Sequence, residues 1–259
     1  MQEYENQGEY QMLYFLLKAV TTYRWVLIIA AVVPAVVLMV RAYQRDRIEK
    51  ESPALLWTLV RGGILSTLLA MVEETVGQWL LGQFVAPEDK LYDIIMFFVI
   101  VAFAEETSKY IFMKRSTWNN PEFNCQYDGV IYALFTSLGF ALWENISYVL
   151  SYGFSTALVR AVTAIPGHAS FGVFMGVFYG LAKRADTEGN RSASTVFRVL
   201  SILAPALLHG AYDYIATRQT DEGTPYFLIY VVVLFIFAFI ATNRASANDV
   251  RFGAGQSQK

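Results

Sequence analysis

The sequence predicts an all-α membrane protein, a polytopic bundle of about seven transmembrane helices. Two features of composition lead to this class. Hydrophobic residues make up 55% of the 259 residues and charged residues only 16%, against about 25% in soluble domains. Several stretches also reach the roughly 20 apolar residues with which a helix crosses the hydrocarbon core. The net charge of −2 gives no basic surface for nucleic acid, so the lipid bilayer is the expected surrounding.

Seven stretches qualify as spans, and they are 25–43, 54–81, 91–113, 128–152, 156–182, 194–217 and 225–243. The first and the last are uniformly apolar and are expected to be anchors. Residues 10–23 are amphipathic, which predicts an interfacial lead-in to the first span. The chain therefore divides into an interfacial segment 1–24, a transmembrane domain 25–243, and a flexible tail 244–259.

Lysine and arginine are distributed unequally between the two sets of loops. Twelve lie on one side: Arg41, Arg45, Arg47, Lys50, Lys114, Arg115, Lys183, Arg184, Arg191, Arg244, Arg251 and Lys259. Four lie on the other: Lys18, Arg24, Lys90 and Arg218. Because cytoplasmic loops carry the excess of basic residues, this distribution predicts an outside N-terminus and a cytoplasmic C-terminus.

Seven ionisable side chains fall inside the predicted spans: Glu105, Glu106, Lys109, Glu144, His168, His209 and Asp213. A charge at the bilayer centre costs roughly 2.5–3.5 kcal/mol even on the permissive insertion scale. Such groups are tolerated where they face one another or a water-filled cavity. The sequence therefore predicts one polar functional site inside the bundle.

On the third span, Glu105 and Glu106 precede Lys109 by four and three residues, so both share a helix face with the lysine. Two adjacent glutamates in a low dielectric do not both ionise cheaply. One is expected to act as a general acid or base, while Lys109 holds the other as a carboxylate. The structural alternative is a buried ion pair that only joins helices, and the further polar groups nearby make it the weaker interpretation.

On the fourth span, Asn145 is adjacent to Glu144 and Tyr148 follows one turn later. A lone glutamate in a span can serve helix association alone. Its two polar neighbours favour a hydrogen-bonded network instead. In that network Asn145 is a candidate donor to an oxyanion, and Tyr148 is a supporting group.

The two histidines lie on the fifth and sixth spans. His168 follows Pro166 and Gly167, and a proline is expected to interrupt the helix beside a cavity. His209 and Asp213 are one turn apart, so the aspartate either orients the imidazole or binds a metal ion with it. A single buried histidine is more often structural, but both histidines of the chain occur in polar motifs.

Three further features of the spans carry weaker expectations. The second span holds another glutamate pair, Glu73 and Glu74, without a matching lysine, and we interpret it as the rim of a substrate access path. Arg160 and Arg198 lie near span ends, where long side chains are expected to extend to the interface. The lone Cys125 excludes an internal disulfide and a cysteine-rich metal cluster.

The order of these motifs resembles the PrsW family of intramembrane proteases, which is distantly similar to the CAAX prenyl-protein endopeptidases and the Abi proteins. The matching stretches are Glu105-Glu106-Thr107-Ser108-Lys109, Asp128-Gly129, Gly139 to Asn145, Pro166-Gly167-His168 and Leu208 to Asp213. They cover residues 91–217, the motif-bearing core and about half of the chain. The flanking anchors and the second span carry no matching motif.

The resemblance implies a membrane-embedded peptidase of the bacterial cytoplasmic membrane. Its substrate would be a single-span membrane protein, typically an anti-sigma factor that is cut at the first site of a cascade. It also implies a catalytic group made of Glu105, Glu106, Glu144, His168, His209 and Asp213.

Two mechanisms agree with these residues. In one, a zinc ion is held by His168, His209 and Asp213 or Glu144, with a glutamate as base. In the other, Glu105 or Glu106 activates water without a metal, and Asn145 and a histidine stabilise the oxyanion. The absence of an HExxH motif and the density of the glutamate pair slightly favour the metal-free route.

Two other classes of function also agree with these residues. Intramembrane Glu, His and Asp also form proton relays, so a proton-coupled transporter or channel is the main alternative. The absence of an obvious repeat pair speaks against it. A membrane scaffold that binds a partner helix through the same groups is the third.

Overall fold

The computed structural model describes residues 2–218 and 223–252. Its helices are α1 (Gln2–Arg45), α2 (Pro53–Phe84), α3 (Lys90–Ile94), the π-helical η1 (Ile95–Val101), α4 (Ala102–Thr117), α5 (Asp128–Tyr152), α6 (Phe154–Val162), α7 (Ala164–Thr187), α8 (Arg191–Ala216) and α9 (Gly223–Ala247). The described residues contain no strand beyond one isolated bridge between Cys125 and Arg251. The predicted all-α class is confirmed.

Six helical segments are long and apolar enough to cross a membrane. They match six of the seven predicted spans, with α6 and α7 together forming one of them. The remaining prediction, 91–113, is helical throughout but is divided among α3, η1 and α4. Helix α1 passes through the predicted boundary at residue 24 without a break. At 1.5 Å per residue its length is about 66 Å, roughly twice the hydrocarbon thickness.

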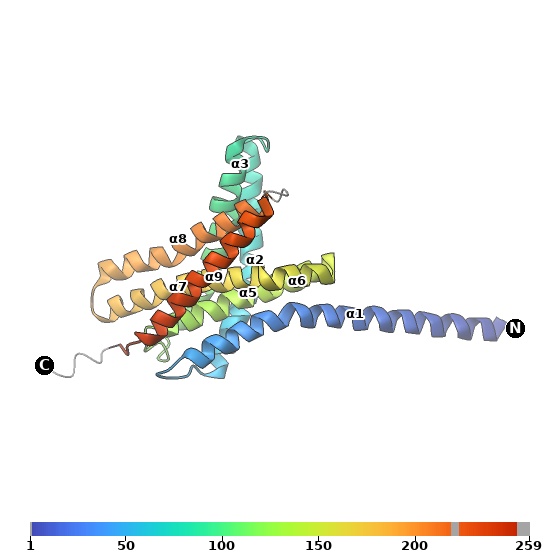
Figure 1. Ribbon diagram of the computed structural model, residues 1–259, viewed down its shortest axis with the longest axis horizontal. Coiled ribbons are helices and arrows are strands. Elements are labelled where there is room, and N and C mark those ends of the chain that lie inside the picture. Colours follow the sequence, from blue (N-terminus) through green and yellow to red (C-terminus); the bar gives the residue numbers. More distant parts are fainter. Residues whose placement is uncertain (1, 219–222, 253–259) are drawn as a thin grey trace.

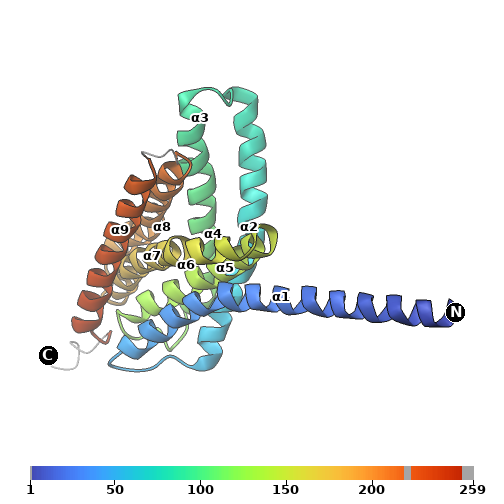
Figure 2. The ribbon, with the colours of Figure 1, turned by 45° about the vertical axis from the view of Figure 1, so that its right-hand side comes forward.

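The helices run in two main directions. Figures 1 and 2 show α1, α5, α6 and α7 lying roughly alongside one another, while α2 and the α3–η1–α4 run cross them steeply. Both figures also show the N-terminal part of α1 projecting beyond the other helices. The motif-bearing helices α4, α5, α7 and α8 therefore meet where the two directions cross.

Small residues bring α5 and α7 together. Gly172, Gly176 and Gly180 recur every four residues on α7 and form one stripe. A Cβ on Gly176 would lie only 2.5 Å from the carbonyl oxygen of Gly129 at the start of α5, and one on Gly172 would lie 2.9 Å from the Cβ of Ser137. Backbones approach this closely only where side chains are absent. The contact fixes Glu144 on α5 relative to His168 on α7.

The π-helical segment η1 stands directly before the helix that carries the glutamate pair. Such segments are frequent at functional sites, because one extra residue in the turn shifts the side chains that follow. Helix α8 packs tightly on it: a Cβ on Gly210 would lie 2.8 Å from the Cα of Phe98. Gly210 follows His209, so this contact helps to set the position of that imidazole.

The loops that carry the basic excess lie at one end of the bundle. Arg251 pairs with Glu49, the backbone N–H of Ser52 donates to Glu122 at 2.7 Å, and Lys183 donates to the carbonyl oxygen of Trp118 at 2.7 Å. These contacts join the α1–α2, α4–α5 and α7–α8 connections to the segment after α9. The grouping agrees with the predicted topology, and the side of the membrane that this end faces remains a prediction.

Two local expectations require correction. Pro166 does not interrupt a helix; the break lies at Thr163, and Pro166 stands in the first turn of α7, where a missing N–H is tolerated. The predicted start of the flexible tail at 244 falls inside helix α9. Helix α9 continues to Ala247, and the N–H of Phe252 donates to the carbonyl oxygen of Asn124 at 2.7 Å. Residues 253–259 of that predicted tail lie outside the described residues.

Candidate active site

A cavity of about 860 Å³ opens between the crossing helices. Its polar and charged lining includes Glu74, Glu105, Glu144, Tyr148, Arg160, His168, His209, Tyr212 and Asp213. Much of the remaining wall is apolar or aromatic, as in Phe140 and Phe171. Pockets that bind organic ligands combine such walls with a few convergent polar groups, and they commonly measure about 300–1,000 Å³.

Helix α4 contributes an ion-pair cluster with a single buried cation. The ammonium of Lys109 is fully buried and lies 3.0 Å from Oε2 of Glu105 and 2.7 Å from Oε1 of Glu106. The same ammonium lies 4.0 Å from the ring centroid of Phe140. One cation is thus held between two carboxyl groups and an aromatic face, as the spacing of the three residues predicts.

The two glutamates face different surroundings. Glu105 lines the cavity, while Glu106 is fully buried behind it. Oε1 of Glu106 contacts both Lys109 and, at 2.9 Å, Nδ1 of His209. Of the pair, only Glu105 is placed to meet a substrate, and Glu106 is placed to hold the lysine and the histidine.

His168 bridges α4 and α5. Its Nδ1 lies 3.4 Å from the ammonium of Lys109, and its Nε2 lies 2.7 Å from Oε2 of Glu144. An ammonium only donates and a carboxylate only accepts, so the contacts assign the lone pair to Nδ1 and the proton to Nε2. The same oxygen of Glu144 lies 3.0 Å from a guanidinium nitrogen of Arg160.

His209 stands between two acids on α8 and α4. Its Nδ1 contacts Glu106, and its Nε2 lies 3.4 Å from Oδ2 of Asp213 one turn later. The ring stacks on Phe171 at a centroid distance of 4.6 Å. An imidazole fixed at both nitrogens and on one face has little freedom to rotate, as a positioned catalytic group requires.

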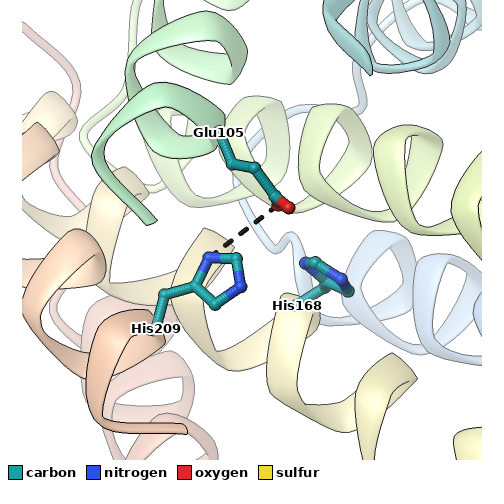
Figure 3. Close-up of side chains that lie close together, drawn as sticks. All are labelled: Glu105, His168 and His209. Carbon is teal, nitrogen blue, oxygen red and sulfur yellow. Dashed lines mark ion pairs between the residues drawn. The ribbon is translucent and has the colours of Figure 1, made fainter. Parts of the chain in front are cut away.

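Figure 3 shows Glu105, His168 and His209 converging on one point from three helices. One donor atom from each lies within 4.8 Å of the other two. A carboxylate and two imidazoles are a donor set that suits catalytic zinc, so these residues fit the group in chemistry. Here the ammonium of Lys109 lies among the donors, bonded to Glu105 and close to His168.

The geometry changes two roles expected from the sequence. The tentative metal set contained Asp213, but the three donors that converge are Glu105, His168 and His209, because Asp213 pairs with His209 instead. Asn145 is fully buried and is not part of the cavity lining: its amide nitrogen donates to the carbonyl oxygen of Ala31 on α1 at 2.8 Å, and its amide oxygen accepts from Arg160.

Tyr148 lies on the cavity wall, where the guanidinium of Arg160 stacks on its ring at 4.1 Å. It therefore supports Glu144 through Arg160.

Two cavity residues were not expected at the site. Arg160 was predicted to extend to the interface, but the helix break at Thr163 directs it to Glu144 and to the side-chain oxygen of Asn145 at 2.8 Å. Glu74 was assigned to a rim, yet it lines the same cavity as Glu105. Its neighbour Glu73 instead accepts a hydrogen bond from Ser108 at 3.1 Å. In the sequence, only the adjacency of Glu73 and Glu74 indicated a functional role for this part of α2.

Comparisons with known proteins agree with this site. The model of the PrsW family intramembrane metalloproteases matches residues 50–242. Proteins named Protease PrsW from Oceanobacillus iheyensis and Halalkalibacterium halodurans are each 32% identical, over 85% and 86% of this chain and 96% and 98% of their own lengths. The Bacillus subtilis protein of that name is 34% identical over 57% of this chain and 66% of its own length.

No solved structure matches the chain. The family match and the spanning helices make the protein a multi-pass protein of a bacterial cell membrane, and the family supports an intramembrane peptidase. The chain belongs to the PrsW family of intramembrane proteases.

Proposed function

We propose that this protein hydrolyses a peptide bond of a single-span membrane protein within the cavity, with Glu105 as the general base. The observation that carries the proposal is the cavity lining, which brings Glu105, His168 and His209 from three helices onto one point. A base must lie within hydrogen-bond reach of the water that it deprotonates. Glu105 is the member of the glutamate pair that faces the cavity.

In the proposed reaction, Glu105 carries one proton from water to the leaving nitrogen. Glu105 takes one proton from water as the water oxygen bonds to the carbonyl carbon, and the same proton passes to the leaving nitrogen as the C–N bond breaks. His209 keeps its Nδ1 contact with Glu106, and its Nε2–H, only 3.4 Å from Asp213, turns to donate to the carbonyl oxygen as negative charge develops there. His168 and Arg160 hold Glu144 at the opposite wall.

Zinc is the alternative means of activating water. It would be held by Glu105, His168 and His209, and when bound it would lower the pKa of a water ligand and polarise the carbonyl group. We favour the metal-free route because each of these donors already has a partner: Lys109 bonds to Glu105 and approaches His168, and carboxylates flank both nitrogens of His209.

The substrate class follows from the family resemblance. We infer an anti-sigma factor-like protein with one transmembrane span, cut at the first site of a proteolytic cascade. The open cavity of about 860 Å³ accommodates an extended peptide segment between its apolar walls.

The test is co-expression of the protein with a single-span substrate and detection of the fragment. Glu105→Gln keeps the shape of the side chain but removes the base, and cleavage is expected to fall by about 10²–10⁴-fold. Glu73→Gln is the matched control, since Glu73 lies on α2, bonds to Ser108 and does not line the cavity. Cleavage by Glu105→Gln at the rate of the control would overturn the proposal.

A further inference from the structure

A second group of buried acids lies at the basic end of the bundle, away from the cavity. It consists of Asp46 just after α1, Glu51 just before α2, and Asp128 at the start of α5. Figure 2 shows the α1–α2 connection and the end of α9 on the same side of the molecule. None of the three acids lines the cavity of the candidate active site.

The three acids are enclosed by protein. Asp46 and Glu51 are each 4% exposed, and Asp128 is 2% exposed. One carboxyl oxygen from each lies within 4.8 Å of the other two. Oxygens on opposite sides of a calcium ion are about 4.8 Å apart, because Ca–O distances are about 2.4 Å. Three oxygens that all lie within this distance of one another can therefore contact one ion together.

Two of the acids have partial hydrogen-bond support. Oδ2 of Asp128 accepts from the N–H groups of Asn124 and Cys125, at 3.0 and 2.7 Å. Glu51 accepts from the hydroxyl of Tyr132 at 3.0 Å. These donors are neutral, so they orient the carboxyl groups without balancing their charge.

Asp46 is the group that points to a missing ligand. Within the described residues, neither of its carboxyl oxygens has a hydrogen-bond partner, although both are buried. The nearest lysine, Lys50, directs its ammonium to the backbone oxygens of Tyr43 and Asp46 rather than to the carboxylate. Native proteins rarely leave a buried carboxylate without a partner, since the cost amounts to several kcal/mol.

The pKa values of these carboxyl groups are raised, as is expected where negative charge is buried without a balancing cation. Burial and, after it, the neighbouring Asp128 carboxylate raise the pKa of Glu51 to about 9. Burial also raises the pKa of Asp46, while Lys50 lowers it. Two chemical solutions exist for such a group: bound protons, or one cation that neutralises several carboxylates at once.

We propose that Asp46, Glu51 and Asp128 form a binding site for one hard divalent cation, magnesium or calcium. The donors are all oxygen atoms, which such cations prefer, and no histidine or free thiolate belongs to the group. The cation joins the end of α1, the α1–α2 connection and the start of α5. Helix α5 carries Glu144, so the site braces the helix that holds one wall of the cavity.

The first experiment measures thermal unfolding of the full-length protein, purified in detergent, stripped with EDTA, and titrated with Mg²⁺ alone or Ca²⁺ alone. We expect a saturable rise of roughly 5 °C with one of them at a hundredfold excess over Kd. The same rise is expected in His168→Ala/His209→Ala, which lacks the imidazoles of the cavity. Mass-spectrometric metal content after dialysis identifies the ion.

Asp46→Asn separates binding from general folding. The amide has nearly the same shape and removes a buried charge that lacks a partner. In cation-free buffer the variant is therefore expected to unfold at or above the temperature of the wild-type protein, and it loses the cation-dependent rise. Glu51→Gln provides the same test if Asp46→Asn does not fold.

The matched control is Glu49→Gln in the same connection. Glu49 is exposed, pairs with Arg251 and accepts from the side-chain amide of Asn124, and it is expected to keep the full rise. Absence of any saturable effect of Mg²⁺ and Ca²⁺ on the wild-type protein would overturn the proposal. An undiminished rise in both Asp46→Asn and Glu51→Gln would overturn it equally.

Discussion

The two buried acidic groups of this protein use the same residue types in different surroundings. At the cavity, Glu105 on the wall and Glu106 buried behind it share the ammonium of Lys109 and lie beside two imidazoles. At the basic end, Asp46, Glu51 and Asp128 have neutral donors only, and Asp46 has none among the described residues. The first group contains an ammonium of its own and borders the cavity, whereas the second is enclosed and, among the described residues, has no cation paired with its carboxyl groups.

Burial alone therefore does not decide whether a carboxyl group serves catalysis or cation binding. Glu105 has a fixed cation on one side and a cavity on the other, which leaves it available to react with water. Asp46 has no paired cation among the described residues and does not line the cavity, so its environment favours the binding of a cation over catalysis. Four variants and treatments test this contrast, in order of decreasing expected effect.

The largest effect is expected from Glu106→Gln. The change removes a fully buried charge that holds both Lys109 and His209. Loss of one partner of a buried ion pair costs about 3 kcal/mol of stability or more, and cleavage is expected to fall at least about a hundredfold because His209 loses its orientation. Thermal unfolding and fragment release measure the two effects. A stable and active Glu106→Gln protein would contradict the view that Glu106 positions Lys109 and His209.

Asp213→Asn is expected to reduce cleavage by about 10–100-fold. Asp213 contacts Nε2 of His209 but is not among the three converging donors. Its loss should lower kcat more than it raises KM, because the orientation of the imidazole acts on the reaction rather than on binding. Steady-state cleavage of a reconstituted substrate separates the two constants, and an unchanged kcat would show that His209 needs no orienting carboxylate.

Arg160→Lys is expected to lower cleavage several-fold. Lysine keeps the charge opposite Glu144, but it cannot also stack on Tyr148 and donate to Asn145 in the planar arrangement of the guanidinium. Arg160→Ala should be more damaging, since it leaves Glu144 paired with His168 alone. Equal cleavage rates in the wild-type protein and Arg160→Ala would show that Arg160 has no role in the reaction.

Selective chelation is expected to give the smallest effect, a shift of a few degrees in unfolding temperature. EDTA removes hard cations and zinc, whereas 1,10-phenanthroline removes zinc and leaves magnesium and calcium bound. We expect EDTA to lower the unfolding temperature and phenanthroline to leave it unchanged, because the oxygen-only group is the one that binds an ion. Equal destabilisation by both chelators would place the metal in the cavity instead.

Much of the fold was predictable from the sequence because membrane helices follow from length and apolarity alone. The grouping of the basic loops at one end was likewise expected from the alternation of Lys and Arg. The division of 91–113 by a π-helical segment was not expected, because seven apolar residues in a row, Ile95–Val101, have no pattern that distinguishes π from α.

The convergence of Glu105, His168 and His209 was predictable because charges in a membrane must face inward. The roles within the group were not. Glu105 and Glu106 are adjacent in sequence, and only helix rotation decides which faces the cavity. Arg160 depends on the break at Thr163, and the group of Asp46, Glu51 and Asp128 joins residues that each resemble ordinary loop or helix-start acids.

The most direct test of the account is the cleavage rate of the purified wild-type protein in proteoliposomes after exhaustive treatment with 1,10-phenanthroline. The substrate is a defined single-span protein, and residual zinc is measured in the same sample. We expect an undiminished rate at well below one zinc per protein, since Glu105 activates water beside Lys109. A rate that falls with zinc content and returns when zinc is added back would contradict it.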